Sequence, residues 1–394
     1  MSVESNMSSE TELTTQESRS RKTICMLLCT PFIIFTVCIA AWRPILIPYS
    51  YKFVKIVSLH IINDKDRFSD NELLLARKEW RLYQLERQFG KQWCNKNEFG
   101  PRKDVAWLTV MVNDDFVVPA LVLGHSVQTF SCHKNMIALI SENVSEDTQN
   151  ALRNVGWETR LVEEMDCNWM DAKVGGDRNS GLFGRPLGHR IKGTHTRFHA
   201  WNYIEFSKMI YVDADYMLMS NIDELFDIPE HFAAAPCSRP GVLDPCFNAG
   251  LLVFKPDLKT YQEIMKHWRE TTEKDTCPTD QELLNEFYAD SGWKELPYAY
   301  NIRRIIFRPM MSFHYACCRP PKPWTSECRP SRKEASKFDG PIITVDDMAL
   351  VFWKNFYELL AHYDLEDWWR STNFSRPTQE FRSDSNSSCW RIYS

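Results

Sequence analysis

The sequence predicts an α/β fold, in which a mainly parallel, open sheet is flanked by helices and preceded by a transmembrane helix. From residue 105 onward, short apolar segments suited to strands alternate with segments of helical pattern, as is typical of parallel sheets. One of these strand segments, 209–212, runs directly into two carboxylates, Asp213 and Asp215. Near the N-terminus, residues 23–42 are apolar and uncharged over the length that crosses a bilayer.

Composition excludes some classes of function. The chain has 394 residues, 44% of them hydrophobic, which suits one large domain or two with a sizeable core. Its net charge is −5 and it has no long Lys/Arg block, so we expect no nucleic-acid partner. Three of the 13 cysteines lie in the apolar segment. The ten that remain are an even number, compatible with disulfides in an oxidising compartment, and their pairing is left open.

The N-terminal part is expected to anchor the chain in a membrane. Residues 1–22 are rich in Ser, Thr and Glu and have the composition of a disordered tail. Basic residues directly precede the apolar segment 23–42, which favours a cytoplasmic N-terminus and a single pass, with the rest in the lumen. A buried core helix is the alternative for this segment. Residues 43–103 are predicted to form a stem with an amphipathic helix over 70–89.

The α/β region is predicted to cover residues 104–330. In chain order, its expected strands are 105–112, 136–140, 158–162, 209–212 and 246–254, and its expected helices are 119–130, 145–154 and 195–206. Pro119 and Ser145 supply helix-start signals. Residues 175–193 are rich in Gly and Arg and are expected to form a mobile loop. Residues 331–394 are predicted to be a helical extension that ends in a loose tail.

The two carboxylates after strand 209–212 are suited to hold a cation. In an extended chain, residues i and i+2 point to the same side, so Asp213 and Asp215 can reach one ion together. Ligands bind beyond the carboxyl ends of strands in open α/β sheets. Hard divalent ions such as Mg²⁺ and Mn²⁺ prefer such oxygen ligands. For an isolated Asp-x-Asp, a turn or a helix N-cap is the more frequent explanation.

Other polar residues follow apolar segments at several places. Asn248 leads a strand, Asp280 and Gln281 open a helix after the cap Thr279, and His314 follows an apolar run. Each has a structural alternative when taken alone: a turn Asn, an Asp that favours a helix N-terminus, or a histidine satisfied in the core.

Taken together, these segments resemble glycosyltransferase family 8, the glycogenin-like group and its bacterial galactosyltransferase relatives. The resemblance covers about residues 105–324, with a weaker continuation to about 360. The matching pieces, in the same order as in the family, are Asn113-Asp114 with Ala120–Gly124, Thr196–Trp201, Asp213-Ala214-Asp215, Asn221–Phe226, Phe247–Gly250, Asp280-Gln281 with Leu284-Asn285, and His314 with Lys322-Pro323-Trp324. Seven ordered pieces make the separate structural alternatives jointly improbable.

The resemblance implies a GT-A fold, which is Rossmann-like, a UDP-sugar donor and a Mn²⁺-type cation. By position, Asp213, Asp215 and His314 would be the metal ligands, and Asp280 and Gln281 would face the anomeric carbon. The donor would be bound by Asn113, Phe116, Arg197, Asp213, Ala214, Asp215, Asn248 and Lys322. Arg197 stands where many members have Lys. Family members retain the anomeric configuration, and both a front-face departure and a covalent step through Asp280 stay open.

One segment departs from the family pattern. From His314 to Trp324 the chain is two residues longer than in relatives and lacks their Gly. Because Gly permits backbone conformations that other residues avoid, this loop must close differently. Either Lys322 or Arg319 could then hold the diphosphate.

The expected protein is a Golgi, single-pass type II membrane glycosyltransferase. It would move a hexose or hexuronic acid from a UDP-sugar to a glycan, glycolipid or protein acceptor. The alternatives are a glycogenin-like self-glucosylating enzyme, which the anchor disfavours, and a non-catalytic lectin-like or scaffold protein. Acceptor sequons at Asn143, Asn373 and Asn386 agree with a lumenal location, whereas the sequon at Asn6 would be cytoplasmic.

Overall fold

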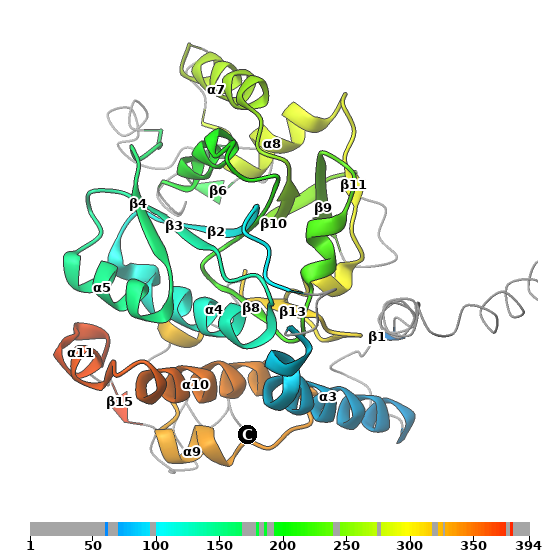
Figure 1. The fold of residues 1–394 in the computed structure, drawn as a ribbon, viewed down its shortest axis with the longest axis vertical. Helices are drawn as coiled ribbons and strands as arrows, with labels where there is room; N and C mark the ends of the chain where they lie inside the picture. The colour runs from blue at the N-terminus through cyan, green and yellow to red at the C-terminus, as the bar shows by residue number, and fades with distance from the viewer. Residues whose placement is uncertain are drawn as a thin grey trace, which may run out of the picture. The chain divides into compact units, whose positions relative to one another are not determined.

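The computed structural model describes residues 60–61, 70–94, 100–167, 179–180, 185–186, 193–238, 245–273, 277–316, 322–325, 328–375 and 379–380. These belong to one compact unit, a sheet with helices on both faces (Figure 1). The predicted tail 1–22 and anchor 23–42 lie outside the described residues. Within the described ranges, no helix is both long and apolar enough to cross a bilayer.

The central sheet has seven strands, in the spatial order β11-β9-β10-β7-β2-β3-β4. β2, β3, β4 and β7 are parallel to one another, as is β11 to β9, whereas β10 runs antiparallel to β7 and to β9. The prediction of an α/β fold with a mainly parallel sheet is confirmed, and β10 is the exception. The strands are β2 Val105–Met111, β3 Met136–Ile140, β4 Glu158–Leu161, β7 Lys208–Val212, β9 Phe232–Pro236, β10 Phe247–Phe254 and β11 Lys294–Glu295.

Helices cover both faces of this sheet, and a further helical layer lies outside α4. In Figure 1, α4 and α5 lie below the sheet, α7 and α8 above it, and α10 and α3 beneath α4, which both of them contact. The helices are α3 Asp70–Cys94, α4 Val117–Phe130, α5 Glu146–Val155, α7 Leu258–Glu273, α8 Asp280–Tyr288, α9 Arg332–Lys337, α10 Val345–His362 and α11 Glu366–Ser371.

Short elements connect these layers. β8 pairs with β13, β1 with β12, β5 with β6, and β14 with β15. The strands are β1 His60–Ile61, β5 Asn179–Ser180, β6 Arg185–Pro186, β8 Tyr216–Leu218, β12 Phe307–Arg308, β13 Ser312–His314, β14 Cys328–Arg329 and β15 Gln379–Glu380. The 3₁₀ helices are η1 Asp114–Phe116, η3 Thr194–Asn202, η4 Asp223–Asp227, η5 Tyr298–Tyr300, η6 Pro323–Thr325 and η7 Asn373–Ser375.

Local sequence explains where the main elements begin and end. β3 and β7 are buried along their whole length, which matches their almost continuous apolar sequence. Ser145 caps α5 by accepting from the Thr148 N–H, and Gly156 ends that helix with φ 109°. Thr279 caps α8 in a reciprocal arrangement with Glu282.

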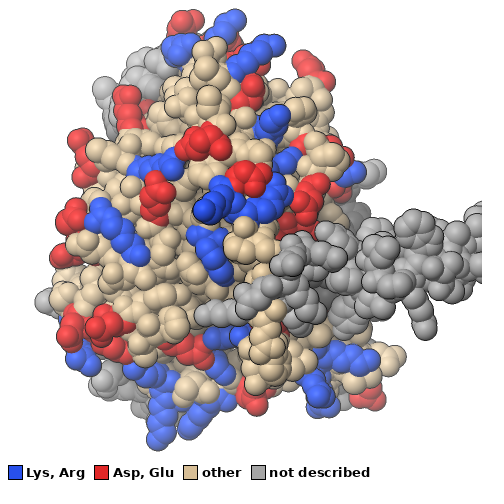
Figure 2. All heavy atoms as spheres, in the orientation of Figure 1, with Lys and Arg blue, Asp and Glu red and all other residues tan. Residues whose placement is uncertain are grey.

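Lys and Arg side chains are intermingled with Asp and Glu over the face of the molecule seen in Figure 2.

One predicted segment differs from the structure, and another lies mostly outside the described residues. The helix expected over 195–206 is a 3₁₀ helix that ends at Asn202. Its first residues, Thr194, His195 and Thr196, are weak α-helix formers, which allows the tighter winding. Of the loop expected over 175–193, only residues 179–180, 185–186 and 193 belong to the described part of the chain.

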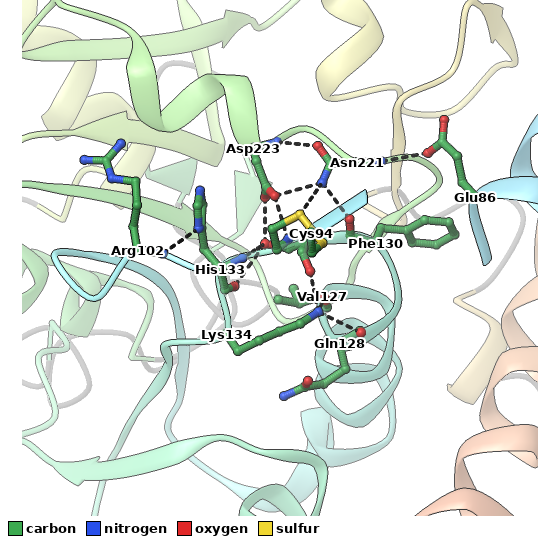
Figure 3. Close-up of a disulfide and its surroundings, with 12 residues drawn as sticks. Glu86, Cys94, Arg102, Val127, Gln128, Phe130, His133, Lys134, Asn221 and Asp223 are labelled. Atoms are coloured by element: carbon green, nitrogen blue, oxygen red, sulfur yellow. Dashed lines mark hydrogen bonds between the residues drawn. A yellow bond between two sulfur atoms is a disulfide. The ribbon is translucent and has the colours of Figure 1, made fainter. Parts of the chain in front are cut away.

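The amphipathic helix expected in the stem is α3, and it is packed into the same compact unit as the sheet. Trp80 and Tyr83 are buried, and a disulfide joins Cys94 at its end to Cys132 after α4. Figure 3 shows this disulfide beside Asn221 and Asp223, which precede and begin η4. The Asp223 carboxylate accepts from the Cys132 N–H at 2.6 Å. The disulfide therefore ties the end of helix α3 to the segment between α4 and β3, which is hydrogen-bonded to η4.

Two further disulfides brace other connections. Cys237–Cys246 closes the connection between β9 and β10. Cys167–Cys277 joins the segment after β4 to the approach to α8. These two disulfides therefore restrain the chain next to strand β10 and helix α8.

Candidate active site

Asp213, Asp215 and His314 meet at the carboxyl end of β7. The antiparallel pair β8–β13 places His314 opposite Tyr216, directly after the two carboxylates. His314 Nε2 lies 3.3 Å from Asp213 Oδ2 and 3.2 Å from Asp215 Oδ1. One possible ligand atom from each residue lies within 4.8 Å of the other two. The three predicted metal ligands thus converge on one point.

Burial and charge act against each other in this cluster. Burial by itself would raise the pKa of Asp213, but the Arg197 guanidinium and His314 hold it well below its usual range. Burial also opposes ionisation of Asp215, whose pKa is lowered by His314 and Lys322. Burial disfavours a charged imidazole, yet the two carboxylates raise the pKa of His314 above its ordinary value. Positive charge is therefore stabilised where the three side chains meet.

Arg197 connects the carboxylate cluster to the start of α8. It is buried on η3, with Nη2 3.0 Å from Asp213 Oδ1 and Nε 3.0 Å from Asp280 Oδ2. Its Nη1 donates to the Ala249 carbonyl at 2.8 Å. Because the guanidinium group is planar and rigid, Arg197 can contact Asp213, Asp280 and the Ala249 carbonyl at once. A Lys ammonium would not have this geometry.

Asn248 and Gln281 form an amide pair next to Asp280. Gln281 Oε1 accepts from Asn248 Nδ2 at 2.8 Å and from the Ala249 N–H at 3.1 Å. The β9–β10 register shifts between Asn248 and Leu252, an irregularity of the kind that re-aims side chains beside active sites. The predicted sugar-facing residues are thus brought together from β10 and α8.

Lys322 reaches the cluster although its loop is longer than in relatives. Its ammonium forms an ion pair with the Asp215 carboxylate. It lies 5.2 Å from the ring centroid of Phe116 and 5.3 Å from that of Trp324. Lys322 therefore lies beside the carboxylate cluster, whereas Arg319, the other residue considered for the diphosphate, lies outside the described residues.

Asn113 and Ala214 have backbone roles in the structure. Asn113 caps η1, since its side chain accepts from the Asp115 N–H at 3.0 Å, and this turn positions Phe116. Ala214 is buried between the two carboxylates. The hydrogen bond from the Tyr216 N–H to the Asp213 carbonyl, at 3.0 Å, closes the turn that contains Ala214.

Sequence reasoning missed residues that shape the site, among them Tyr211 and Gly250. The Tyr211 hydroxyl donates to Asp213 Oδ1 at 2.7 Å, and the two-residue spacing on one strand face was an available signal. Gly250 lies against His314: a Cβ there would come within 3.0 Å of the imidazole ring and of Asn248 Oδ1. Its position at the end of the Asn-Ala-Gly segment was a signal too, since Gly allows close approach.

A mixed α/β sheet whose strand β7 leads into an Asp-Ala-Asp turn, beside a histidine and two side-chain amides, is the arrangement expected of a glycosyltransferase. The chain belongs to glycosyl transferase family 8, whose sequence model matches residues 107–328, more than half of its length. This confirms the predicted family and the prediction of a glycosyltransferase enzyme.

Relatives of known identity agree with this assignment. Glycogenin-1 of Mus musculus is 30% identical over 284 residues, which covers 66% of this chain and 79% of glycogenin-1. Glycogenin-1 of Homo sapiens is 30% identical over 269 residues, covering 64% of this chain and 72% of the relative. Galactinol synthase 6 of Arabidopsis thaliana is 29% identical over 170 residues, covering 33% of this chain and 49% of the relative.

Proposed function

We propose that this enzyme is a Mn²⁺-dependent, retaining transferase that moves a hexose or hexuronic acid from a UDP-sugar to a glycan, glycolipid or protein acceptor. The observation that carries the proposal is the convergence of Asp213, Asp215 and His314, with Lys322 on one side and Asp280 on the other. Membership of family 8 supports sugar transfer in general, and the finer assignments rest on this arrangement.

The donor set fits a Mn²⁺-type ion. Two carboxylates and one imidazole suit Mn²⁺ better than Ca²⁺, which takes oxygen ligands only. The Oδ1 atom of Asp213 is occupied by Arg197 and Tyr211, while Oδ2 faces His314. When bound, the ion would act as a Lewis acid toward the diphosphate leaving group.

Each neighbouring side chain has a role that its chemistry suits. Lys322 supplies a point charge for the diphosphate from beside Asp215. Phe116 offers an aromatic face for the uracil on the turn that Asn113 caps. Asn248 and Gln281 supply amide groups for sugar hydroxyls. Asp280 has one oxygen engaged by Arg197, and its other oxygen is the group we assign to the anomeric side.

We also propose that the catalytic unit works in the lumen of the Golgi as part of a single-pass type II protein. The support is the apolar segment 23–42 and the three disulfides among the described residues, since disulfides persist in oxidising compartments.

The deciding experiment is UDP release by the purified full-length chain against a panel of UDP-sugars, first with Mn²⁺ and then with EDTA. We expect turnover of one sugar, lost with EDTA, and loss of transfer in Asp215→Asn. Glu205→Gln, at a surface position, serves as the control variant. UDP binding without turnover of any donor would instead indicate a non-catalytic protein.

Self-glucosylation is the second candidate, because glycogenin-1 is among the similar proteins. Incubation with UDP-glucose followed by intact-mass measurement separates the two. Mass increments of one hexose on the protein itself would support the self-glucosylating alternative, and an unchanged mass with UDP release would support transfer to a separate acceptor.

A further inference from the structure

We propose that Asn301 is a positioning residue that holds His314 in its cation-binding tautomer and joins the cation site to the sugar site. The inference deepens the proposed function and rests on it. Asn301 lies outside every motif that pointed to the site, and it carries no charge. Its importance follows from the direction of four hydrogen bonds.

Asn301 is buried immediately beside the strand that carries His314. It follows η5 and is fully inaccessible to solvent. The next residue, Ile302, bridges to Phe313 of β13, and its carbonyl accepts from the His314 N–H at 2.9 Å. The Asn301 side chain therefore has a fixed place from which it meets both His314 and Asn248.

A backbone donor determines which way the amides point. The Gly250 N–H donates to Asn248 at 3.1 Å, so the atom that it meets must be the oxygen, Oδ1. The Asn301 atom 2.9 Å from this oxygen must then be the amide nitrogen, Nδ2. The remaining Asn301 atom is its oxygen, which lies 3.1 Å from His314 Nδ1. The assignment depends on a peptide N–H, which can only donate.

The orientation of Asn301 decides the protonation pattern of His314. Because Asn301 Oδ1 can only accept, His314 Nδ1 carries a hydrogen and donates it. In the neutral imidazole, the lone pair is then on Nε2, the atom that faces Asp213 and Asp215. A metal-bound histidine usually has its other nitrogen held by such a partner, which sets the tautomer and the ring orientation.

The same side chain extends the network into the sugar site. Asn248 Nδ2 donates to Gln281 Oε1 at 2.8 Å, and the Ala249 N–H donates to the same oxygen at 3.1 Å. One continuous set of hydrogen bonds therefore runs from Gln281 through Asn248 and Asn301 to His314. A rotation of the Asn301 amide would break contacts on both sides, so the two sites share one geometry.

The test uses two substitutions of Asn301. One removes both of its contacts, and the other removes only the hydrogen bond that it donates to Asn248. Asn301→Leu removes both contacts, and we expect Mn²⁺ affinity to fall about 10–100-fold, as for other groups that orient metal ligands. Asn301→Asp keeps an acceptor for His314 but presents oxygen to Asn248 Oδ1. We expect it to weaken Mn²⁺ binding less than Asn301→Leu, while the KM for the UDP-sugar rises in both variants.

The readout is Mn²⁺ binding to the full-length protein, measured by electron paramagnetic resonance without donor, together with the KM for the donor that the wild type uses. Asn355→Leu is the matched control, because it removes another buried amide, on α10, whose partners Tyr83 and Val351 are not residues of the site. Melting temperatures in EDTA show whether a variant is folded. A purely structural role would lower those temperatures without the ordered loss of Mn²⁺ binding.

Three outcomes would overturn the inference. Wild-type Mn²⁺ affinity in folded Asn301→Leu contradicts the tautomer role. An unchanged KM for the UDP-sugar in Asn301→Asp contradicts the link between Asn301 and Asn248. If Asn301→Leu does not fold, the measurements on Asn301→Asp decide whether the inference holds. Absence of Mn²⁺ binding by the wild type defeats the proposed function and the inference with it, whereas wild-type binding with unaffected variants defeats the inference alone.

Discussion

The two oxygens of Asp213 have different partners, and this division shows how single residues build the site. Oδ1 accepts from Tyr211 and pairs with Arg197, whereas Oδ2 faces His314. The carboxylate is thus held by one oxygen, and the other is aimed at the place where the three ligand atoms converge. A site residue positioned in this way needs little reorganisation on binding a cation.

At Gly250 we expect a side chain to displace His314. A methyl group there would come within 3.0 Å of the imidazole and of Asn248 Oδ1, a separation that Cβ atoms do not show. Because His314 is buried at the end of β13 and its backbone is held in the strand, its ring would turn away from the carboxylates. Gly250→Ala should therefore weaken Mn²⁺ binding and transfer by about tenfold or more. Titration with Mn²⁺ checks this prediction. Gly292→Ala is the control, because a Cβ at Gly292 would meet no other atom. Gly292 has a positive φ, so we expect that control to lose a modest amount of stability.

His133 should make the stability of the protein sensitive to acid. Burial and Arg102 lower the pKa of His133, and Asp223, Asp227 and Asp104 oppose this only in part. Its Nδ1 accepts from the Arg102 N–H at 3.1 Å, as Figure 3 shows, so protonation would remove that bond. Because its pKa is lowered on folding, the stabilisation is present above the unfolded pKa of about 6.5 and is lost as pH falls through the folded value.

The change that tests this is His133→Asn, which keeps an acceptor near Nδ1 and does not titrate. We expect the melting temperature of the wild type to fall more steeply between pH 7 and pH 5 than that of the variant. Parallel pH profiles for the two proteins would show that His133 does not contribute to acid sensitivity.

At the scale of elements, α3 supports the strands that carry the site. Glu79 on α3 pairs with Arg308 of β12, which is 2% exposed, and accepts from the Met310 N–H at 3.1 Å. Arg308 also donates to the Ile342 carbonyl. The segment held in this way leads directly into β13 and His314. Helix α3 therefore holds in place the segment that leads to His314.

Glu79→Ala should destabilise the protein strongly. Removing one partner of a buried ion pair leaves the Arg308 charge uncompensated, which costs about 3–5 kcal/mol. Urea unfolding of the oxidised protein measures the loss. Glu205→Ala breaks the more exposed pair with Arg160 and should cost less than about 1 kcal/mol. Equal losses in the two variants would contradict the role that we give to α3.

Elements with a strong local pattern could be predicted from the sequence, and elements set by distant contacts could not. Ser145 and Thr279 were recognised as caps because capping depends on nearby residues. The antiparallel direction of β10 has no local signature, since the same apolar run suits either direction. In the site, motif order pointed to His314, whereas Asn301 belongs to no recognised motif. Its partners His314 and Asn248 are 13 and 53 residues away, so no local pattern marks it.

For the whole molecule, the acceptor sequons test the proposed type II orientation of the catalytic unit. Asn143 lies exposed on the turn between β3 and α5, and its side chain contacts Glu164 at 3.0 Å. Asn373 is also exposed, at the start of η7. Both are accessible to a glycosylating enzyme if this unit enters the secretory lumen. Asn6 precedes the apolar segment 23–42 and would stay on the other side.

A type II orientation therefore predicts glycans on Asn143 and Asn373 and none on Asn6. We expect the full-length protein from secretory cells to shift to lower mass on treatment with a glycan-removing amidase. Asn143→Gln should remove one glycan, and Asn6→Gln should change nothing. A glycan on Asn6 without one on Asn143 would show the opposite orientation. Absence of glycans from Asn143 and Asn373, together with free thiols at Cys94 and Cys132, would place the catalytic unit in a reducing compartment and favour the self-glucosylating alternative.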